Sequence, residues 1–114
     1  MANNTISRNR TIGKALTTTN ANIYVVPLRY SAHVDSIVIS NVSATSVTFS
    51  LDWYDSAAAT YYPIGGQVVM QPHSVIQITD GFMLQYNDAF RGLASVDAAI
   101  TVSVRVREEY SVVL

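Results

Sequence analysis

The stretch Ser46-Val47-Thr48-Phe49-Ser50-Leu51-Asp52-Trp53 alternates polar and apolar side chains without a break. Successive side chains of a β-strand point to opposite faces, so this alternation buries the apolar set and leaves Thr48, Ser50 and Asp52 outside. The same period of two runs through most of residues 33–114, and no segment has the spacing of an amphipathic helix. The sequence therefore predicts an all-β protein.

Turn residues divide this pattern into short strands. Clusters of Gly, Pro, Asn and Asp mark the expected turns, including Gly65-Gly66, and Asp80-Gly81 is the strongest hairpin signal. The expected strands are 21–27, 32–41, 46–54, 60–64, 67–70, 74–79, 82–86, 90–94 and 98–108. Strand starts spaced by about 8 to 12 residues predict a single antiparallel β-sandwich, of either the jelly-roll or the immunoglobulin-like kind.

Length and composition narrow the class of protein further. A chain of 114 residues suits one domain, and the absence of Cys leaves packing alone to hold the fold, without disulfides or zinc thiolates. Only 13% of the residues are charged, compared with roughly 25% in an average domain. The net charge of −1 gives no basic surface, so a nucleic-acid partner is not expected.

The distribution of apolar residues gives no sign of a membrane partner. The longest apolar stretches, such as residues 23–27, are far shorter than the roughly 20 residues of a membrane-spanning helix. The first five residues, Met-Ala-Asn-Asn-Thr, lack the apolar segment of a secretory signal. The chain is expected to be made in a cytoplasm and either to stay there or to leave it inside a particle.

Residues 1–20 differ from the rest of the chain. They are rich in Asn and Thr and carry Arg8, Arg10 and Lys14, with few aliphatic side chains. Such a segment cannot bury a core of its own. The expected organisation is therefore an extended N-terminal arm over residues 1–20 and a β-sandwich domain over residues 21–114. A frayed terminus and an arm held by a neighbouring subunit both fit this composition.

The sequence contains few patterns typical of catalysis or metal binding. The histidines, His33 and His73, are too few for a zinc signature, and neither has the neighbours of a nucleophile motif. The Gly65-Gly66 pair lacks the Lys and the following helix of a phosphate-binding loop. No cofactor or metal is expected from these residues.

The aspartates have structural explanations. Four of them sit in or beside turns, where Asp is favoured by its own hydrogen bonding: Asp55, Asp80, Asp88 and Asp97. Asp35 and Asp52 fall on the outward phase of strands, where solvent reaches them. With no pair of carboxylates facing one substrate, the chain is not expected to be an enzyme.

Aromatic residues gather around residues 55–59, where Trp53, Tyr54, Tyr61 and Tyr62 lie close in sequence. Exposed at one end of a sandwich, they would form a platform for sugar rings. However, Trp53 is in phase with the buried set of its strand, and Tyr at strand edges is also typical of protein interfaces. Burial or a subunit interface is therefore favoured, and a carbohydrate-binding module stays as an alternative.

Six segments, taken in order, resemble a family of small virion proteins of tailed bacteriophages. These segments are 23–27, 34–41, 47–53, 76–81, 84–88 and 98–108. The resemblance covers about residues 21–110 and leaves residues 1–20 outside. The chain departs from the family at residues 28–32, where a Gly-rich turn is usual, and at Asn87, where a Gly often stands.

The resemblance implies a non-enzymatic β-sandwich in the virion, assembled in the host cytoplasm. Its implied role is a capsid decoration (cement) protein that binds the major capsid protein and copies of itself. A ring-forming neck or tail component is the first alternative. Weakly charged faces rich in Ser, Thr and Asn suit such docking, because burying them strands few charges.

On this hypothesis the sandwich is a rigid body and residues 1–20 strap it to a neighbour, with a reach of at most ~66 to 72 Å. The candidate partner-binding residues are aliphatic and cationic side chains of the arm and tyrosines near strand edges. They are Ile6, Arg8, Arg10, Ile12, Tyr30, Tyr61 and Tyr62.

Overall fold

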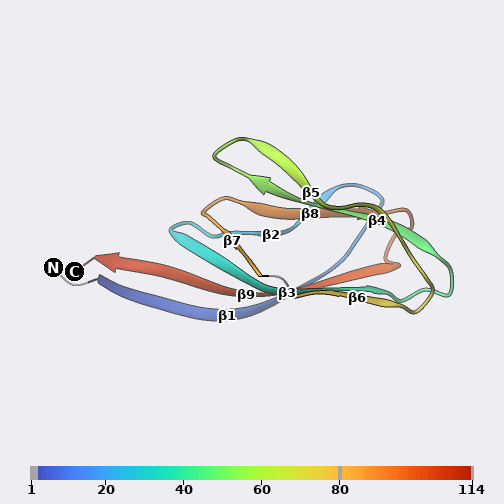
Figure 1. Ribbon diagram of the computed structural model, residues 1–114, viewed down its shortest axis with the longest axis horizontal. Helices are drawn as coiled ribbons and strands as arrows, with labels where there is room; N and C mark the ends of the chain where they lie inside the picture. The colour runs from blue at the N-terminus through green and yellow to red at the C-terminus, as the bar shows by residue number, and fades with distance from the viewer. Residues whose placement is uncertain (1–2, 80, 114) are drawn as a thin grey trace.

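All regular secondary structure in the described part of the chain, residues 3–79 and 81–113 of a computed structural model, is β-strand (Figure 1). The strands are β1 (Asn3–Ala15), β2 (Ala21–Val25), β3 (Tyr30–Asn41), β4 (Val47–Asp55), β5 (Thr60–Met70), β6 (Val75–Ile78), β7 (Phe82–Leu84), β8 (Ala89–Ala94) and β9 (Ile100–Val113).

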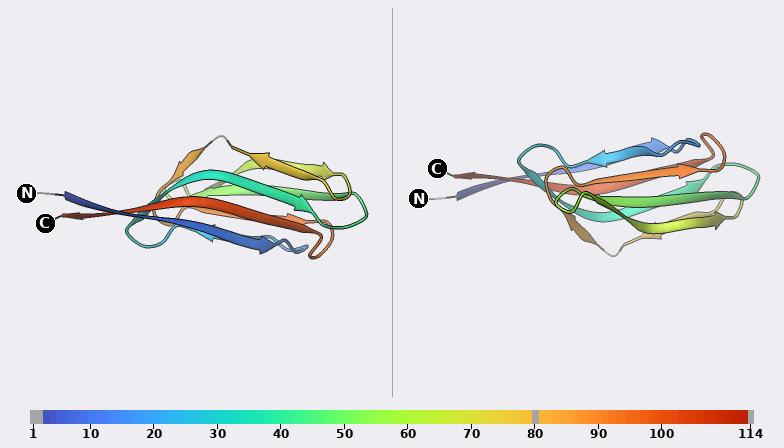
Figure 2. Two further views of the ribbon diagram at one scale, coloured as in Figure 1. Left: turned by 90° about the horizontal axis from the view of Figure 1, so that it is seen from below. Right: turned by 90° about the horizontal axis from the view of Figure 1, so that it is seen from above.

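The strands form two antiparallel sheets that pack face to face, seen from the side in Figure 1 and from below and above in Figure 2. Sheet A has the order β1-β9-β3-β6, with β7 also paired to β3, and sheet B has the order β2-β8-β4-β5. The first strand pairs with the last and the second with the last but one, which is the nested order of a jelly roll. The predicted antiparallel β-sandwich is therefore confirmed, in its jelly-roll form.

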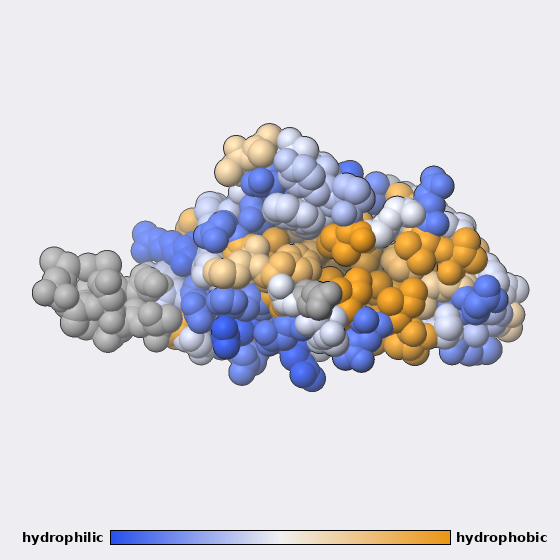
Figure 3. Space-filling view, in the orientation of Figure 1, coloured by the Kyte–Doolittle hydropathy of each residue, from blue (hydrophilic) through white to orange (hydrophobic). Residues whose placement is uncertain are grey.

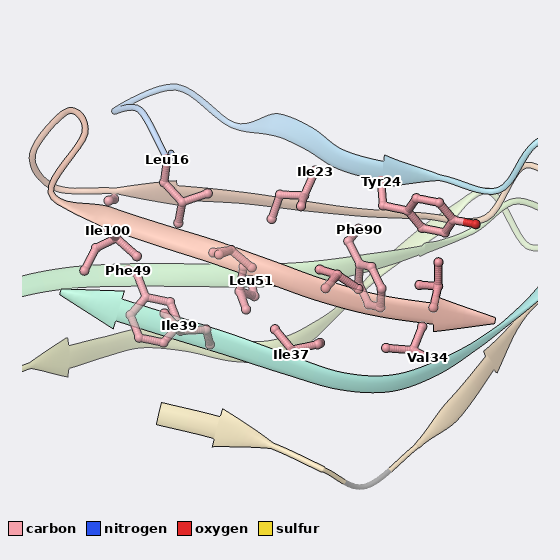
Figure 4. Packing of buried hydrophobic residues seen from close by; sticks show 14 of the residues in the cluster. Leu16, Ile23, Tyr24, Val34, Ile37, Ile39, Phe49, Leu51, Phe90 and Ile100 are labelled. Carbon is pink, nitrogen blue, oxygen red and sulfur yellow. The ribbon is translucent and has the colours of Figure 1, made fainter. Parts of the chain in front are cut away.

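The alternation seen in the sequence packs the core between the sheets (Figure 4). From β4, Val47, Phe49 and Leu51 are buried, as predicted, and from β9 every second residue between Ile100 and Val106 is buried. Trp53 continues the inward phase of β4 but is only partly buried, because it lines an open groove at the side of the sandwich. The alternation of side chains along each strand therefore determines which residues fill the core between the two sheets.

The N-terminal segment belongs to sheet A, which corrects the expected division at residue 20. β1 pairs with β9 without a register shift, from Asn3 opposite Val113 to Ala15 opposite Thr101. Leu16 follows it into the core and is fully buried. The polar composition of this segment does not predict packing in a core. It is nevertheless compatible with a strand, because backbone hydrogen bonds to β9 hold β1 in the sheet. The segment is extended, as expected, but it is an edge strand of the sandwich.

Beyond the sandwich, β1 and β9 continue together as a projecting two-stranded ribbon (Figures 1 and 2). We define the ribbon as residues 3–6 of β1 paired with residues 110–113 of β9. β3 flanks only its root, where Tyr30 pairs with Tyr110. The ribbon contributes to the elongated shape of the molecule, which measures 57 × 26 × 20 Å.

Two expected turns differ from the structure. Asp80 of the predicted Asp80-Gly81 hairpin lies outside the described residues, but the flanking strands β6 and β7 both pair with β3 and not with each other. Gly65-Gly66 lies inside β5, beside a register shift against β4. A small, flexible residue pair fits a β-bulge as well as a turn, so the sequence did not separate the two.

Candidate functional site

A buried carboxylate, that of Glu108, lies between the sheets at the root of the ribbon. Glu108 continues the inward phase of β9, and its side chain is fully buried. Three donors surround its oxygens. Arg8 Nε lies 2.5 Å from Oε1, Arg10 Nη1 lies 3.2 Å from Oε2, and the Tyr24 hydroxyl donates to Oε2 over 2.5 Å. The group therefore joins β1, β9 and β2, and we call these four residues the clamp.

The electrostatics of the clamp keep Glu108 ionised. Burial alone would raise the pKa of Glu108, but hydrogen bonds from Tyr24 and Arg8 and the charges of both arginines outweigh it and hold the pKa below its usual value. Burial and the neighbouring carboxylate raise the pKa of Tyr24. An ionised carboxylate whose two oxygens are both occupied by fixed donors fits a structural role better than proton transfer.

Glu108 was not among the residues predicted to be functional, although its buried position can be read from the sequence. Ile100, Val102, Val104 and Val106 alternate inward, so the same phase places Glu108 inside. An acidic residue at an inward position requires cationic or hydrogen-bonding partners. Those partners come from β1 and β2, and sequence spacing does not reveal which strands face β9.

The candidate residues of the N-terminal segment share the inward side of β1. Arg8 and Arg10 bind Glu108, and the Arg8 guanidinium also lies 4.5 Å from the centre of the Tyr30 ring. Ile12 packs against the core, whereas Ile6 is 53% exposed. The structure thus brings Arg8, Arg10 and Tyr30 together inside one chain and leaves Ile6 open to a partner.

The remaining candidates, Tyr61 and Tyr62, lie on opposite faces of β5. Tyr61 lies on the outer face of sheet B, where its ring centre is 4.7 Å from that of Tyr54. The Arg91 guanidinium lies 3.5 Å from the centre of the Tyr61 ring. Tyr62 stacks on Trp53 on the inner face, with 5.3 Å between ring centres. These aromatic rings do not form the single platform that the carbohydrate-binding alternative needs.

An apolar groove opens along one side of the sandwich, between β5 of sheet B and the strands β6 and β7 of sheet A. Its volume is about 340 Å³. Figure 3 shows apolar residues gathered over this part of the surface. The groove is lined by Trp53, Pro63, Ile64, Ile78, Phe82 and Met83. The groove could not be predicted from the sequence, because it forms where strands of two different sheets lie side by side without pairing.

A second hollow is polar and lies on sheet A, lined by Asn9, Arg10, Thr11, Asp35 and Arg105. Within residues 3–79 and 81–113, no three His, Cys, Asp or Glu side chains are grouped to hold a metal ion. The same residues include no helix long and apolar enough to cross a membrane.

The chain resembles known proteins in its fold but matches none of the family models or curated sequences. No protein-family model matches it, and no curated protein matches it significantly in sequence. A solved structure of Bacillus endospore appendages, disulfide-linked pili, contains a similar chain, with a TM-score of 0.58 and 15% identity over 99% of this chain and 93% of that one. A chain of infectious bursal disease virus strain Gx has a TM-score of 0.47 and 5% identity over 97% of this chain and 38% of its own. The pilus subunit shares the sandwich fold.

Proposed function

We propose that this protein is a non-enzymatic structural protein of a bacteriophage virion, a capsid decoration protein that binds the major capsid protein and stabilises the shell. The observation that carries the proposal is the ribbon, a rigidly rooted element that projects beyond the sandwich. Its sequence, residues 3–6 and 110–113, contains no charged residue. An uncharged strand pair that projects from a domain suits docking on another subunit.

The clamp supports this role. Arg8 and Arg10 from β1 and Glu108 from β9 tie the two ribbon strands together directly at its root, and Tyr24 ties them to sheet B. A ribbon fixed in this way loses little conformational freedom when it binds, which favours affinity. The accessible surface of 6407 Å² also leaves ample room for a standard interface of about 800 Å² per partner.

The order of the sequence motifs is the reason for proposing that the protein belongs to a virion. The segments between residues 21 and 110 resemble small virion proteins of tailed bacteriophages, and β2, β3, β4 and β9 include most of them. A decoration protein acts through many copies, so modest contacts at each site add up over the shell. Melting of the whole particle is then the property that this protein changes.

The test measures binding to undecorated shells assembled from the major capsid protein of a tailed bacteriophage. Full-length protein is expected to co-sediment saturably with the shells and to raise their melting temperature. Ile6→Asp should weaken binding at least tenfold, because it places a charge on the exposed inner side of the ribbon. Ser7→Asp, one residue away and on the opposite face of β1, is the matched control.

A result without binding would contradict the decoration role. Equal binding by the wild type and Ile6→Asp would show that a different surface docks on the shell. Deletion of residues 1–20 is unsuitable as a test, since it removes β1 and the buried Leu16 from the fold.

A repeating assembly of this chain alone, as a neck or tail ring or as a filament, is the second candidate. The observation that favours it is the shared fold with a subunit of the Bacillus endospore pili over nearly both full chains. Those pili are disulfide-linked. This chain has no Cys, so its copies would associate without disulfides. Electron microscopy of the concentrated protein, without shells, separates this candidate from decoration.

A further inference from the structure

We propose that the apolar groove between β5 and the strands β6 and β7 receives the ribbon of a second copy of this chain. The inference deepens the proposed structural role, because it names a partner and the two surfaces that meet. It rests on that role only in requiring that the chain work as an assembled subunit. The groove and the ribbon lie on different parts of the molecule, so each copy offers one of each.

The groove is a poor place for water. Its volume of about 340 Å³ has room for about ten water molecules at ~30 Å³ each. Its six lining residues are apolar or aromatic and include no charged side chain. Water needs two to four polar partners to be held well, so apolar side chains are the better occupants. Met83, at the rim, is 52% exposed and accessible to such a partner.

The ribbon offers an exposed apolar side chain, that of Ile6. Ile6 is 53% exposed and lies opposite Tyr110 of β9 on the inner side of sheet A. Sheet B stops short of the ribbon, so this side is one layer of a sandwich without the other (Figure 1). The groove of a second copy supplies the missing layer, with Trp53 and Ile64 of its sheet B facing Ile6.

The backbone edges favour the same arrangement. β1 is a 13-residue edge strand without Pro and without a register shift against β9. Long, unbroken edge strands of this kind pair readily with other chains. β6, the edge strand of sheet A at the groove, has only four residues. A ribbon laid along β6 would continue sheet A into the next copy and direct Ile6 into the groove.

The donor and the acceptor surfaces are different, so the contact is heterologous. A heterologous contact repeats from copy to copy and closes into a ring or extends as a filament, depending on its rotation. Two copies joined in this way still have one free ribbon, which stays available to the capsid protein, and one free groove.

The test uses the purified full chain by itself, in analytical ultracentrifugation from about 1 µM to about 1 mM, the range of weak protein contacts. The wild type is expected to form species larger than a monomer as concentration rises. Ile6→Asp in the ribbon and Met83→Asp in the groove should each stay monomeric. Ser7→Asp and Val69→Asp, at exposed positions facing away from these surfaces, should associate like the wild type.

Mixing the two monomeric variants gives the decisive measurement. The intact ribbon of Met83→Asp can enter the intact groove of Ile6→Asp, and no further copy can add. The equimolar mixture should therefore form a one-to-one dimer and nothing larger. Melting curves and near-ultraviolet circular dichroism of each variant confirm that both are folded before they are mixed.

Three outcomes would overturn the inference: a monomeric wild type at all concentrations, variants that associate like the wild type, or a mixture that stays monomeric. Because no shell is present, each of these leaves the decoration role untouched. If the wild type is monomeric and Met83→Asp abolishes shell binding, the groove takes the capsid protein and not a second copy.

Discussion

The hydroxyl of Tyr24 in sheet B donates a hydrogen bond of 2.5 Å to the buried carboxylate of Glu108 in sheet A. It is a charge-assisted bond across the sandwich, where most other contacts are apolar. Arg8 and Arg10 neutralise the same carboxylate from β1. The bond therefore connects β2 to the strand pair that carries the ribbon.

Replacing Tyr24 by Phe removes this hydroxyl and leaves the ring in the core. A hydrogen bond to a charged group contributes about 2 kcal/mol, so Tyr24→Phe should lower the free energy of unfolding by about that amount. Urea denaturation followed by circular dichroism measures the change. Tyr86→Phe, at a side chain that is 50% exposed, should change stability by less than about 0.5 kcal/mol. Equal effects in the two variants would contradict the role of the clamp.

Glu108→Gln keeps the shape of the side chain and removes its charge. At pH 7 we expect a loss of about 2 kcal/mol, smaller than for a fully buried ion pair because the arginines that remain are half exposed. The pKa of folded Glu108 lies below its ordinary value of 4.5, so its stabilisation is full above that pH. It is lost as pH falls through the lower, folded pKa.

The melting temperatures of the wild type and Glu108→Gln, measured from pH 7 to pH 2, check this sign. Their difference should be constant above about pH 5 and shrink below pH 4.5 as the wild-type carboxylate is protonated. A difference that grows on acidification would mean that Glu108 is held in its neutral form in the folded state. Arg105→Gln, on the outer face of β9, should leave the profile unchanged.

Asn41→Ala tests a hydrogen-bond hub at the end of β3. The buried Asn41 amide donates to the carbonyl oxygens of Thr45, Met70 and Gln71 at 2.9, 3.2 and 3.1 Å, and its oxygen accepts from Ser43. Leaving these groups without a partner should cost about 3 kcal/mol in urea denaturation. The exposed Asn22, replaced by Ala, is the control, and a loss no larger than its own would refute the hub.

Gly92→Ala and Gly13→Ala form a pair with opposite expected effects. A Cβ at Gly92 would lie 2.7 Å from Leu51 Cδ2 and 3.0 Å from the Ser50 carbonyl oxygen, so overpacking should lower stability by about 2 kcal/mol. A Cβ at Gly13 meets no described atom within 4 Å, and Ala there should be neutral or stabilising by about 0.5 kcal/mol. Thermal melting of both variants distinguishes close packing at Gly92 from a general intolerance of Ala in these strands.

The core could be predicted from the sequence because it depends on local alternation. Val47, Phe49 and Leu51 show their direction within one strand, and the structure buries all three. The assignment of residues 1–20 was different, since β1 is held mainly by backbone bonds to β9, and backbone bonds leave no mark on side-chain composition. An edge strand of polar residues therefore looks like a loose arm.

The candidate site was only partly predictable for a related reason. The inward phase of Glu108 is visible in the sequence, but Tyr24 and Arg8 become its partners only through the order of strands in two sheets. The groove is harder still to predict, because its lining side chains come from β4 and β5 of sheet B and from β6 and β7 of sheet A, which do not pair across the groove. Strand order is a property of the whole chain, and periodicity within a strand does not encode it.

The nested order of the jelly roll also determines when this protein can fold. β9 lies between β1 and β3, so β1 has no strand partner until β9 has been synthesised, and until then β3 can pair only with β6 and β7. Most strand pairs then join residues far apart in the chain, a topology that slows folding to milliseconds or longer. During synthesis the early strands wait without partners, and their apolar faces are open to aggregation. Sheet A is therefore completed only when β9, the last strand of the chain, becomes available.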